Sequence, residues 1–432
     1  MEARLRGEES DRQAQHGPMI VASSGRGGDP PARRDPEPLH RRGGICQPPH
    51  GRRGMRGRSD GRDGTLGGTS DNAAMRARIR PGDDPAAVAD GAARIRAGEL
   101  VAFPTETVYG LGANALDPLA VARIFEVKER PSFDPLIVHL ADVSGLRQHA
   151  LDADLRDPRV ASLVKSFWPG PLTLVLRKRP AVPDIVTAGL PTVGLRVPDH
   201  PVALRLLREA GVPIAAPSAN RFGRLSPTRA EHVARQLGDR IGLILDGGAS
   251  RIGVESTVLL LSGGSAVLLR PGGLPVEDIE ALIGPIERAA AAGPGGTRGR
   301  VEPSTAAARA PGQLLSHYAP VAPLAVVPPA VAVEVRAGER VGLLAASEAG
   351  RRRAAAAGGP FAAVEVPAPD GDLLRLAAGL FEALHRLDGA NLDRIVAQPV
   401  ADVGLGRAIM DRLRRAAAAG SGSAAGGDQP KR

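Results

Sequence analysis

The chain has 432 residues, of which 43% are hydrophobic and 2% aromatic, and it carries a formal net charge of +9. This length allows two or three domains, and the hydrophobic share is ordinary for a globular protein. Cys46 is the single cysteine, which excludes an internal disulfide and favours the reducing cytoplasm. No hydrophobic run approaches the roughly 18 residues of a membrane helix, so no membrane partner is expected. The positive charge fits RNA binding, and it equally fits a basic tail with solvated surface arginines.

Residues 1–79 are rich in Arg, Gly and Pro and show no hydrophobic periodicity, which predicts a disordered tail. Two interpretations of this segment stay open: an RNA-binding arm, and a start of translation at Met75 instead of Met1. A second disordered tail is expected at 416–432.

The stretch 100–140 is the unit around which the first domain is organised. Its predicted elements are an apolar strand at 100–103, a hydroxyl-rich loop at 104–114, a helix from 118 that Pro131 stops, and an apolar strand at 136–140. Lys128 and Arg130 lie at the end of that helix. The unit therefore brings a hydroxyl-rich loop and two cations to the same sheet edge, which is the outline of an anion-binding site.

Hydrophobic patterns and cap residues predict alternating helices and strands after this unit. Helices are expected after Asp84-Pro85, at 156–168, after Asp199 and Pro201, after the capping box Thr228-x-x-Glu231, and at 275–283, 373–387 and 409–415. Strands are expected at 172–176, 192–197, 213–216, 241–245, 256–261, 266–270, 324–327, 340–345 and 392–396. The alternation indicates an α/β fold with a largely parallel sheet. The predicted organisation is a sheet domain at 80–285, a linker and strap at 286–320 and a smaller α/β domain at 321–415.

Polar side chains recur where the predicted strands of the first domain begin or end. They are Thr105, Glu106, Thr107, His139, Thr192, Arg196, Ser218, Asn220, Glu255, Ser256, Thr257 and Arg270. Ligands of open α/β sheets bind in the crevice outside the strand ends, so these side chains are candidates for one site. Each alone also has a structural explanation, as a turn former, a buried core histidine or a solvated cation. Their coincidence at one sheet edge favours a shared binding site.

Four cations, Lys128, Arg130, Arg196 and Arg270, would surround this cleft, and their mutual repulsion predicts that a polyanion fills it. A nucleoside triphosphate together with a carboxylate would satisfy them. The sequence has no G-x-S-x-G nucleophile, no paired cysteines and no His spacing typical of a metal site, so no tightly bound metal is predicted. Catalysis is expected to rest on positioning and charge stabilisation. Residues 110–115 match a dinucleotide fingerprint weakly, but the loop before them is too long for one.

Several motifs resemble those of one known family. Lys128-Glu129-Arg130 resembles its K-x-R motif, and Ser218-Ala219-Asn220 resembles its S-x-N motif. Four further segments resemble other signatures of the family: PTETVYGLG, FWPGPLTLVL, GVESTV and LRPGG. The family is that of the YrdC-type threonylcarbamoyl-AMP synthases. The segment from Pro311 to Pro320, with its His317-Tyr318 pair, and the extra α/β domain resemble the longer, two-domain branch. The resemblance implies an open twisted YrdC-like sheet domain with a central cleft, a linker strap and a smaller Rossmann-like α/β domain.

The same resemblance implies an enzyme, a nucleotidyltransferase that converts L-threonine, bicarbonate or carbon dioxide, and ATP into L-threonylcarbamoyladenylate and pyrophosphate. The product would pass to a tRNA threonylcarbamoyl transferase, which forms N6-threonylcarbamoyladenosine in tRNA, and Mg²⁺ would enter with ATP. The implied catalytic residues are Lys128, Arg130, Ser218 and Asn220. The implied threonine contacts are Thr105, His139, Arg196, Ala216 and Ser256. The implied ATP contacts are Lys128, Ser132, Thr192, Ser218, Ser226, Arg270 and Tyr318, the last on the strap that closes over the nucleotide.

Two positions depart from the family. The family often has Asn at the position of Asp134, and it often has a basic residue at the position of Ser316. Asp134 would recruit a magnesium ion or weaken binding of the triphosphate. One alternative function is a double-stranded-RNA-binding or ribosome-associated module of the same fold without catalysis. The S-x-N pair argues against it, because phosphate-backbone binding needs cations and not that pair. Another alternative, a carbamoyl-transfer enzyme, would carry clustered cysteines and an acylphosphatase segment.

Overall fold

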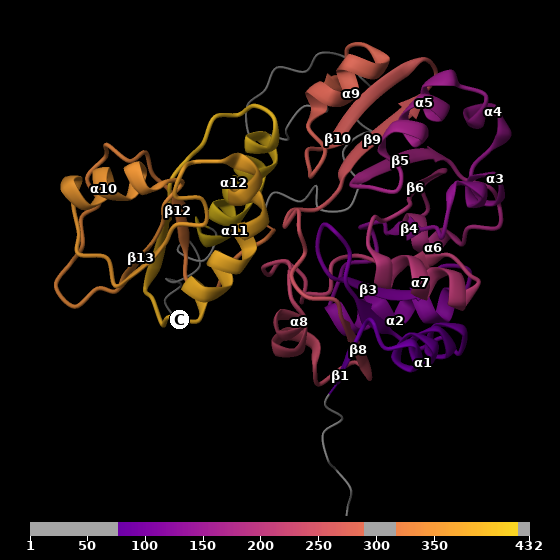
Figure 1. Ribbon diagram of the computed structural model, residues 1–432, viewed down its shortest axis with the longest axis horizontal. Coiled ribbons are helices and arrows are strands. Elements are labelled where there is room, and N and C mark those ends of the chain that lie inside the picture. The colour runs from indigo at the N-terminus through magenta and orange to yellow at the C-terminus, as the bar shows by residue number, and fades with distance from the viewer. Residues whose placement is uncertain (1–76, 289–316, 422–432) are drawn as a thin grey trace, which may run out of the picture. The chain divides into compact units, whose positions relative to one another are not determined.

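Two sheets form the framework of the computed structural model, which describes residues 77–288 and 317–421 (Figure 1). The larger sheet has 11 strands, in the spatial order β1 (Arg78–Pro81), β8 (Leu243–Asp246), β2 (Val101–Phe103), β3 (Gly110–Asn114), β7 (Ile214–Ala215), β4 (Ile137–His139), β6 (Thr192–Arg196), β5 (Leu172–Arg177), β9 (Thr257–Ser262), β10 (Ser265–Arg270) and β11 (Glu287–Arg288). The smaller sheet has 4 strands, in the order β12 (Leu324–Val326), β15 (Arg394–Ala397), β13 (Val341–Leu344) and β14 (Ala363–Glu365). The predicted α/β class is confirmed.

The larger sheet is mixed, whereas the sequence predicts a largely parallel one. Its parallel pairs are β1/β8, β2/β8, β4/β6, β5/β9 and β10/β11, and its antiparallel pairs are β2/β3, β3/β7, β4/β7, β5/β6 and β9/β10. A parallel pair needs a crossover of a dozen or more residues, and the connections from β2 to β3 and from β9 to β10 are too short to provide one. Between β9 and β10 the chain turns in two residues, Gly263 and Gly264, whose φ angles of 57° and 89° suit a tight hairpin. The described pairs of the smaller sheet are all parallel.

The predicted loop 104–114 contains a strand, because β3 pairs with β2 on one side and β7 on the other. Glycines conceal it, since glycine is depleted from strands and carries no apolar side chain to reveal a pattern. A Cβ added at Gly112 would lie 2.8 Å from both Ile214 Cγ2 and Phe103 Cε1. Only glycine therefore fits between the side chains of the neighbouring strands.

Helices connect most of these strands, and Asp-Pro pairs start several of them as the sequence predicts. The helices of the larger domain are α1 (Pro85–Arg96), α2 (Pro118–Lys128), α3 (Leu146–His149), α4 (Asp152–Leu155), α5 (Pro158–Phe167), α6 (Asp184–Thr187), α7 (Pro201–Ala210), α8 (Ala230–Leu237) and α9 (Val276–Ile283), with a 3-10 turn at Val143–Gly145. Asp84 accepts a hydrogen bond from the Ala86 N–H, and Asp117 accepts hydrogen bonds from the N–H groups of the first turn of α2. The smaller domain has α10 (Glu348–Ala357), α11 (Leu373–Asp388) and α12 (Leu405–Ser421).

Two predicted helix starts are wrong. Helix α7 is capped by the ring of His200, which accepts from the Val202 N–H, and not by Asp199. Helix α8 begins at Ala230 without a side-chain cap. The predicted capping box does not form because the Thr228 N–H donates to Nδ1 of His232 at 3.2 Å. The sequence also misses β1, β14 and α10, and it starts α12 four residues too late because glycines at 404 and 406 obscure the helical pattern.

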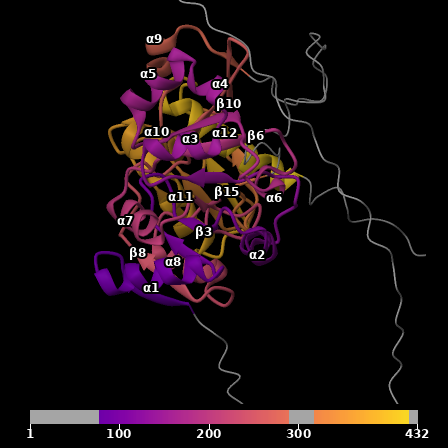
Figure 2. The ribbon, with the colours of Figure 1, turned by 90° about the vertical axis from the view of Figure 1, so that its right-hand side faces the viewer.

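The larger sheet has apolar layers on both faces. Helices α1 and α7 lie side by side over β2 and β8 (Figures 1 and 2), where their buried residues include Val88, Ile95 and Leu206. A separate and larger cluster includes the inward face of α2, with Val121, Ile124 and Phe125 buried as predicted. Polar groups at the strand ends between these two layers are thus held by rigid elements on both sides.

Helices α11 and α12 share a third apolar cluster with loops of the larger domain. It combines Val108, Leu225 and Val254 with Phe381 and Ile409. Gly253, with a φ angle of 74°, lies directly against α11: a Cβ there would be 2.4 Å from the Ala377 carbonyl oxygen. The two regions therefore pack through a continuous dehydrated core.

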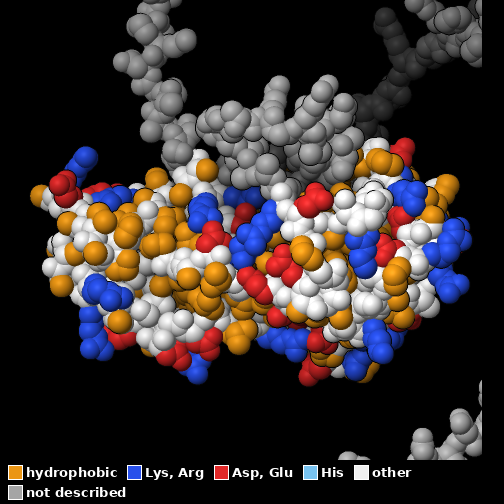
Figure 3. Space-filling model, turned by 90° about the horizontal axis from the view of Figure 1, so that it is seen from above, with side chains coloured by type: hydrophobic (Ala, Val, Ile, Leu, Met, Phe, Trp, Pro, Cys, Tyr) orange, Lys and Arg blue, Asp and Glu red, His pale blue; other side chains and the backbone are white. Residues whose placement is uncertain are grey.

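The surface mixes both signs of charge. On the face shown in Figure 3, basic and acidic side chains are interspersed. Many described arginines have acidic partners, such as Arg94 with Asp90 and Arg386 with Glu365. Among the described residues, no helix combines the length and apolar character needed to cross a membrane.

Candidate active site

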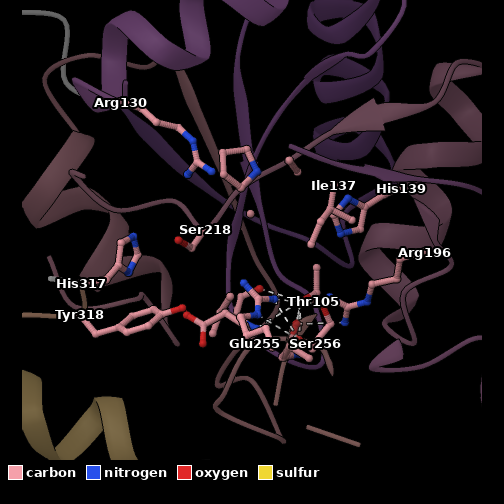
Figure 4. Close-up of a pocket in the computed structure, with 16 residues that line it drawn as sticks. Thr105, Arg130, Ile137, His139, Arg196, Ser218, Glu255, Ser256, His317 and Tyr318 are labelled. Atoms are coloured by element: carbon pink, nitrogen blue, oxygen red, sulfur yellow. Dashed lines mark hydrogen bonds between the residues drawn. The ribbon is translucent and has the colours of Figure 1, made fainter. Parts of the chain in front are cut away.

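A cavity of about 530 Å³, partly open to solvent, lies where strand ends of the larger sheet meet the start of the smaller domain. Its lining comprises Thr105, Thr107, Val108, Gly110, Arg130, Ile137, His139, Arg196, Ala216, Pro217, Ser218, Glu255, Ser256, Arg270, His317 and Tyr318. Figure 4 shows the labelled side chains around a common space, with Arg130 and Arg196 on different sides of it. The cavity therefore receives charged groups from several elements.

Arg196 ends β6 and is opposite His139 of β4 in the register of the sheet. Its Nη2 lies 2.7 Å from Oε1 of Glu106, and both side chains are almost fully buried. The same nitrogen donates to Oγ1 of Thr107 at 3.0 Å, and Nε donates to the Gly170 carbonyl at 3.1 Å. These bonds fix the plane of the guanidinium at the cavity wall. A guanidinium fixed in this way suits a carboxylate, which it can bind through two parallel hydrogen bonds.

His139 is buried beside Arg196, and its Nδ1 has no hydrogen-bond partner among the described residues. Burial, reinforced by the charge of Arg196, lowers the pKa of His139 to about 3. The ring is therefore neutral at pH 7. A neutral ring in this place offers one hydrogen-bonding nitrogen to a ligand without adding a fourth positive charge to the cavity wall.

Arg130 reaches the cavity because the chain turns sharply after α2. Glu129 has a left-handed conformation, with a φ angle of 55°, so Lys128 and Arg130 are directed to different surroundings. Nη2 of Arg130 lies 2.8 Å from Oδ2 of Asp134 and donates to the Pro135 carbonyl at 3.0 Å. Burial lowers the pKa of Arg130, although the Asp134 carboxylate opposes this effect. Asp134 thus places a carboxylate on one side of this guanidinium.

Lys128 does not line the cavity, in contrast to the predicted ring of four cations. It is buried, and its ammonium donates to the carbonyl oxygens of Ser218, at 2.6 Å, and of Asn220. Burial, together with the charge of Arg130, lowers its pKa well below the ordinary value. The sequence does not reveal this position, because the carbonyls that receive the ammonium lie about 90 residues further along the chain.

The K-x-R and S-x-N motifs hold one another in place. Besides receiving Lys128, the Ser218–Asn220 turn is closed by a hydrogen bond from Oγ of Ser218 to Oδ1 of Asn220. Nδ2 of Asn220 donates to the carbonyls of Arg221, at 2.7 Å, and Arg224, at 2.9 Å. Asn220 is fully buried and, like Lys128, lies behind the cavity wall. In this conformation Ser218 is the member of the S-x-N pair that reaches the cavity.

A third guanidinium, that of Arg270, lies at the end of β10. Its Nη2 donates to the Ser256 carbonyl at 2.9 Å, and Oγ of Ser256 is 2.8 Å from Oγ1 of Thr173. Glu255 lies beside it with Oε1 accepting from the Ser226 hydroxyl. Burial by itself raises the pKa of Glu255, but the charges of Arg412 and Arg270 hold it at about 2. This carboxylate is therefore ionised at pH 7.

His317 and Tyr318 complete the wall from the first described residues after the linker. Tyr318 has a left-handed backbone, with a φ angle of 63°, and the next N–H, of Ala319, donates to the Gly223 carbonyl at 2.8 Å. The His317 ring packs edge-on against Tyr318 and Phe222. Burial and the Arg130 charge lower the pKa of His317 to about 3. Residues 289–316 of the predicted linker and strap, which include Ser316, lie outside the described residues.

The structure brings most of the predicted site residues together. Those that line the cavity are Thr105, Arg130, His139, Arg196, Ala216, Ser218, Ser256, Arg270 and Tyr318. Lys128, Asn220 and Ser226 are buried behind it. Thr192 instead lines a second, smaller cavity of about 260 Å³ with Thr173 and Thr187, and Ser132 is exposed.

Five polar residues of this site fall outside the predicted contact set: Glu106, Thr107, Glu255, His317 and Arg412. Glu106, Thr107 and Glu255 were visible as polar residues at strand ends, and His317 as part of the His-Tyr segment. Arg412 gave no signal, because its partner Glu255 lies 157 residues earlier in the chain. Among the described residues, no group of three or more His, Cys, Asp or Glu side chains is arranged to hold a metal ion.

Comparison with known proteins is consistent with this geometry. Residues 93–272 match the family model described as telomere recombination, and residues 274–418 match the model described as threonylcarbamoyl-AMP synthase, C-terminal domain. The threonylcarbamoyl-AMP synthase of Bacillus subtilis is 46% identical over 343 residues, which is 76% of this chain and 92% of that protein. The enzyme of the same name from Pyrococcus abyssi is 46% identical over 329 residues, covering 74% and 91%.

The chain belongs to the threonylcarbamoyl-AMP synthase family. A solved structure of this family, P. abyssi Sua5 in complex with L-threonine, aligns with a TM-score of 0.66 and 41% sequence identity, covering 77% of this chain and 94% of that one. The match extends over both sheets, so the two-domain form of the family predicted from the sequence is confirmed.

Proposed function

We propose that this protein is an L-threonylcarbamoyladenylate synthase, which converts L-threonine, bicarbonate or carbon dioxide, and ATP into L-threonylcarbamoyl-AMP and pyrophosphate. The observation that carries the proposal is one cavity lined by three guanidiniums, in a member of this family. In this proposal residues 80–285 hold the catalytic domain, 286–320 the strap and 321–415 the smaller domain. The product is handed to a tRNA threonylcarbamoyl transferase in the cytoplasm.

Threonine is proposed to bind at the Arg196 side of the cavity. The guanidinium receives its carboxylate, and the neutral ring of His139 lies next to the place left for its amine and hydroxyl. Thr105, Ala216 and Ser256 complete the pocket. Because Glu106 already balances the charge of Arg196, one bound carboxylate leaves this side with a net negative charge, which favours a neighbouring cationic group.

ATP is proposed to bind at the Arg130 and Arg270 side, with Ser218 and Tyr318 in contact with it. Lys128, Asn220 and Ser226 support this side from behind, since they hold the Ser218 turn and Glu255. Lys128, Ser132, Thr192 and Ser226 remain proposed ATP contacts although none of them lines the cavity. Lys128, Arg130, Ser218 and Asn220 remain the proposed catalytic residues. Magnesium enters as part of the MgATP substrate.

The proposed reaction needs little covalent participation by the protein. The threonine amine adds to carbon dioxide and loses a proton, which gives a carbamate. A carbamate oxygen then attacks the α-phosphorus, a new P–O bond forms, and the bond to the β-phosphate breaks to release pyrophosphate. Arg130 and Arg270 stabilise the charge that develops on the phosphates. Closure by Tyr318 excludes water, which would otherwise favour loss of carbon dioxide from the carbamate.

The test is release of pyrophosphate by the purified full-length protein with ATP, bicarbonate and threonine, with omission of threonine as the control. We expect threonine-dependent release and a product with the mass of threonylcarbamoyl-AMP. The double variant Arg130→Gln/Arg270→Gln should lose both, while Arg179→Gln, which removes an exposed pair with Asp152, should retain them. Binding of double-stranded RNA without threonine-dependent release would overturn the proposal in favour of the RNA-binding module.

A further inference from the structure

Arg412 is a buried arginine of the smaller domain that reaches toward the cavity from behind. It lies on α12 and is 1% exposed. Its Nε lies 2.8 Å from Oε2 of Glu255, and its Nη1 donates to the Pro271 carbonyl at 2.9 Å and to Asp411 at 2.7 Å. The guanidinium carbon also lies 5.1 Å from the centre of the Tyr318 ring. Arg412 therefore contacts two residues of the cavity wall, Glu255 and Tyr318.

The charges around the cavity show why this contact matters. Arg130 and Arg196 each have a carboxylate of their own, in Asp134 and Glu106. Glu255 is the third buried carboxylate, and it lies between two guanidiniums, those of Arg270 and Arg412. Asp411 also contacts Arg412 but is paired with Arg415, so Arg270, Glu255 and Arg412 together with this pair carry a net charge of about +1. Without Arg412, Glu255 and Arg270 would cancel.

We propose that Arg412 is a positioning residue of the active site, which binds the Glu255 carboxylate so that the charge of Arg270 acts on the bound triphosphate. The carboxylate orientation supports this role, because one oxygen accepts from the Ser226 hydroxyl and the other faces Arg412. The smaller domain thus contributes to the electrostatics of a cavity whose lining comes mainly from the larger sheet.

The low pKa of Glu255, about 2, agrees with the geometry, because among the charges that lower it Arg412 acts most strongly and Arg270 next. Nη2 of Arg412 is buried with no hydrogen-bond partner among the described residues. Burying this nitrogen without a partner costs solvation free energy, and a purely apolar contact between the domains would avoid that cost.

This inference rests on the proposed function only in taking ATP as the polyanion, so its test measures binding. ATP and threonine dissociation constants are determined by calorimetry on the full-length chain and its variants. We expect Arg412→Gln to weaken ATP binding about tenfold and to leave threonine binding within twofold. Arg412→Lys, which keeps the charge, should stay within about threefold of the wild type.

The deciding variant is Glu255→Gln/Arg412→Gln, which removes both charges and restores the balance at Arg270. It should recover ATP binding to within about threefold of the wild type. Arg407→Gln is the matched control, because Arg407 also lies on α12 and bridges to the larger domain, 2.6 Å from Glu277. It should leave ATP binding unchanged.

Two results would overturn the inference: Arg412→Gln binding ATP as tightly as the wild type, or the double variant binding as weakly as Arg412→Gln. If Arg412→Gln does not melt as a folded protein, the double variant and Arg412→Lys decide alone, and weak ATP binding by both overturns it. Failure of the wild type to release pyrophosphate would instead refute the proposed function, and it would leave these differences in ATP binding to be judged separately.

Discussion

The two sheets use their buried polar side chains in opposite ways. At the strand ends of the larger sheet, Arg130, Arg196 and Arg270 are paired with acidic groups or carbonyls yet still line an open cavity. At the end of β15 in the smaller sheet, Gln398 is buried and bonded to its own domain: Oε1 accepts from the Ala346 N–H at 3.2 Å, and Nε2 donates to the Gly350 carbonyl at 2.9 Å.

This difference shows that a polar residue at a strand end makes a binding site only if part of its hydrogen-bonding capacity faces a cavity. A neutral amide can be satisfied by nearby backbone, whereas a buried guanidinium has five N–H groups and a charge to place. The strands of the smaller sheet are parallel, and ligands of such sheets usually bind at the strand ends. At the end of β15, however, Gln398 bonds to neighbouring backbone of its own domain. Its domain instead contributes Arg412 to the cavity of the other.

The largest expected effect is loss of the buried ion pair in the larger sheet. Arg196→Met leaves Glu106 buried without its partner, so we expect the free energy of unfolding in urea to fall by about 3–5 kcal/mol. Arg386→Gln, which breaks the more exposed pair with Glu365 in the smaller domain, should cost less than about 1 kcal/mol. Equal losses for the two variants would contradict the contrast between the regions.

Arg196→Lys tests the geometry of the same group and not its charge. A lysine ammonium keeps the positive charge but lacks the planar fork that holds a carboxylate at two points. We expect the threonine dissociation constant to rise about 10- to 30-fold while the ATP dissociation constant changes less than threefold. Calorimetry with each ligand measures both, and an unchanged threonine constant would remove Arg196 from the proposed threonine site.

Gln398→Leu should show the reverse pattern. It leaves the Ala346 N–H and the Gly350 carbonyl without their partner, so we expect a loss of about 2 kcal/mol in the free energy of unfolding. Affinities for ATP and threonine should remain within twofold. Ser256→Ala, in the wall of the cavity, provides the opposite case, with a small effect on stability and a larger one on threonine binding. A drop in ligand affinity in Gln398→Leu would show that the smaller sheet also forms part of the site.

The smallest effect concerns the contact between the two regions, where His232 stacks on His385 with ring centres 3.9 Å apart. Burial is the main cause that lowers the pKa of His232 to about 3 and that of His385 to about 4. The unfolded chain, with a pKa of about 6.5, takes up these protons first, so stability is lost as the pH falls below about 6.5. Between pH 7 and 5.5 the wild type should lose about 1 kcal/mol more than His385→Gln. Parallel pH curves of the two unfolding free energies would contradict this.

Local signals in the sequence predicted much of the fold. Asp117 with Pro118 starts α2, and the spacing of Val121, Ile124 and Phe125 gives its buried face. Such features depend on neighbours within one or two turns. Elements that depend on partners elsewhere were missed: β3 is a strand because its glycines fit beneath Phe103 and Ile214, which no local propensity encodes.

The residues of the site also divide into those with a local signal in the sequence and those whose positions depend on distant partners. The positions of Arg196, Ser256 and Arg270 at strand ends could be predicted, because a strand that ends at a sheet edge presents its last side chains there. The carboxylates that accompany the arginines could not, since Glu106 meets Arg196 across 90 residues and only in the folded sheet. Lys128 is the clearest case: the sequence predicted it as one of four cations around the cleft, with a solvated helix end as the alternative, and two carbonyls of a distant turn bury it.

The separation of Glu255 and Arg412 along the chain also has a consequence for biosynthesis. The ribosome adds Arg412 157 residues after Glu255, which at usual elongation rates of roughly 5–20 residues per second takes about 8–30 s. During that interval the nascent larger domain can collapse around Glu255 and Arg270 while their third partner does not yet exist. A chain that ended after the larger domain would therefore carry Glu255 and Arg270 without the guanidinium of Arg412.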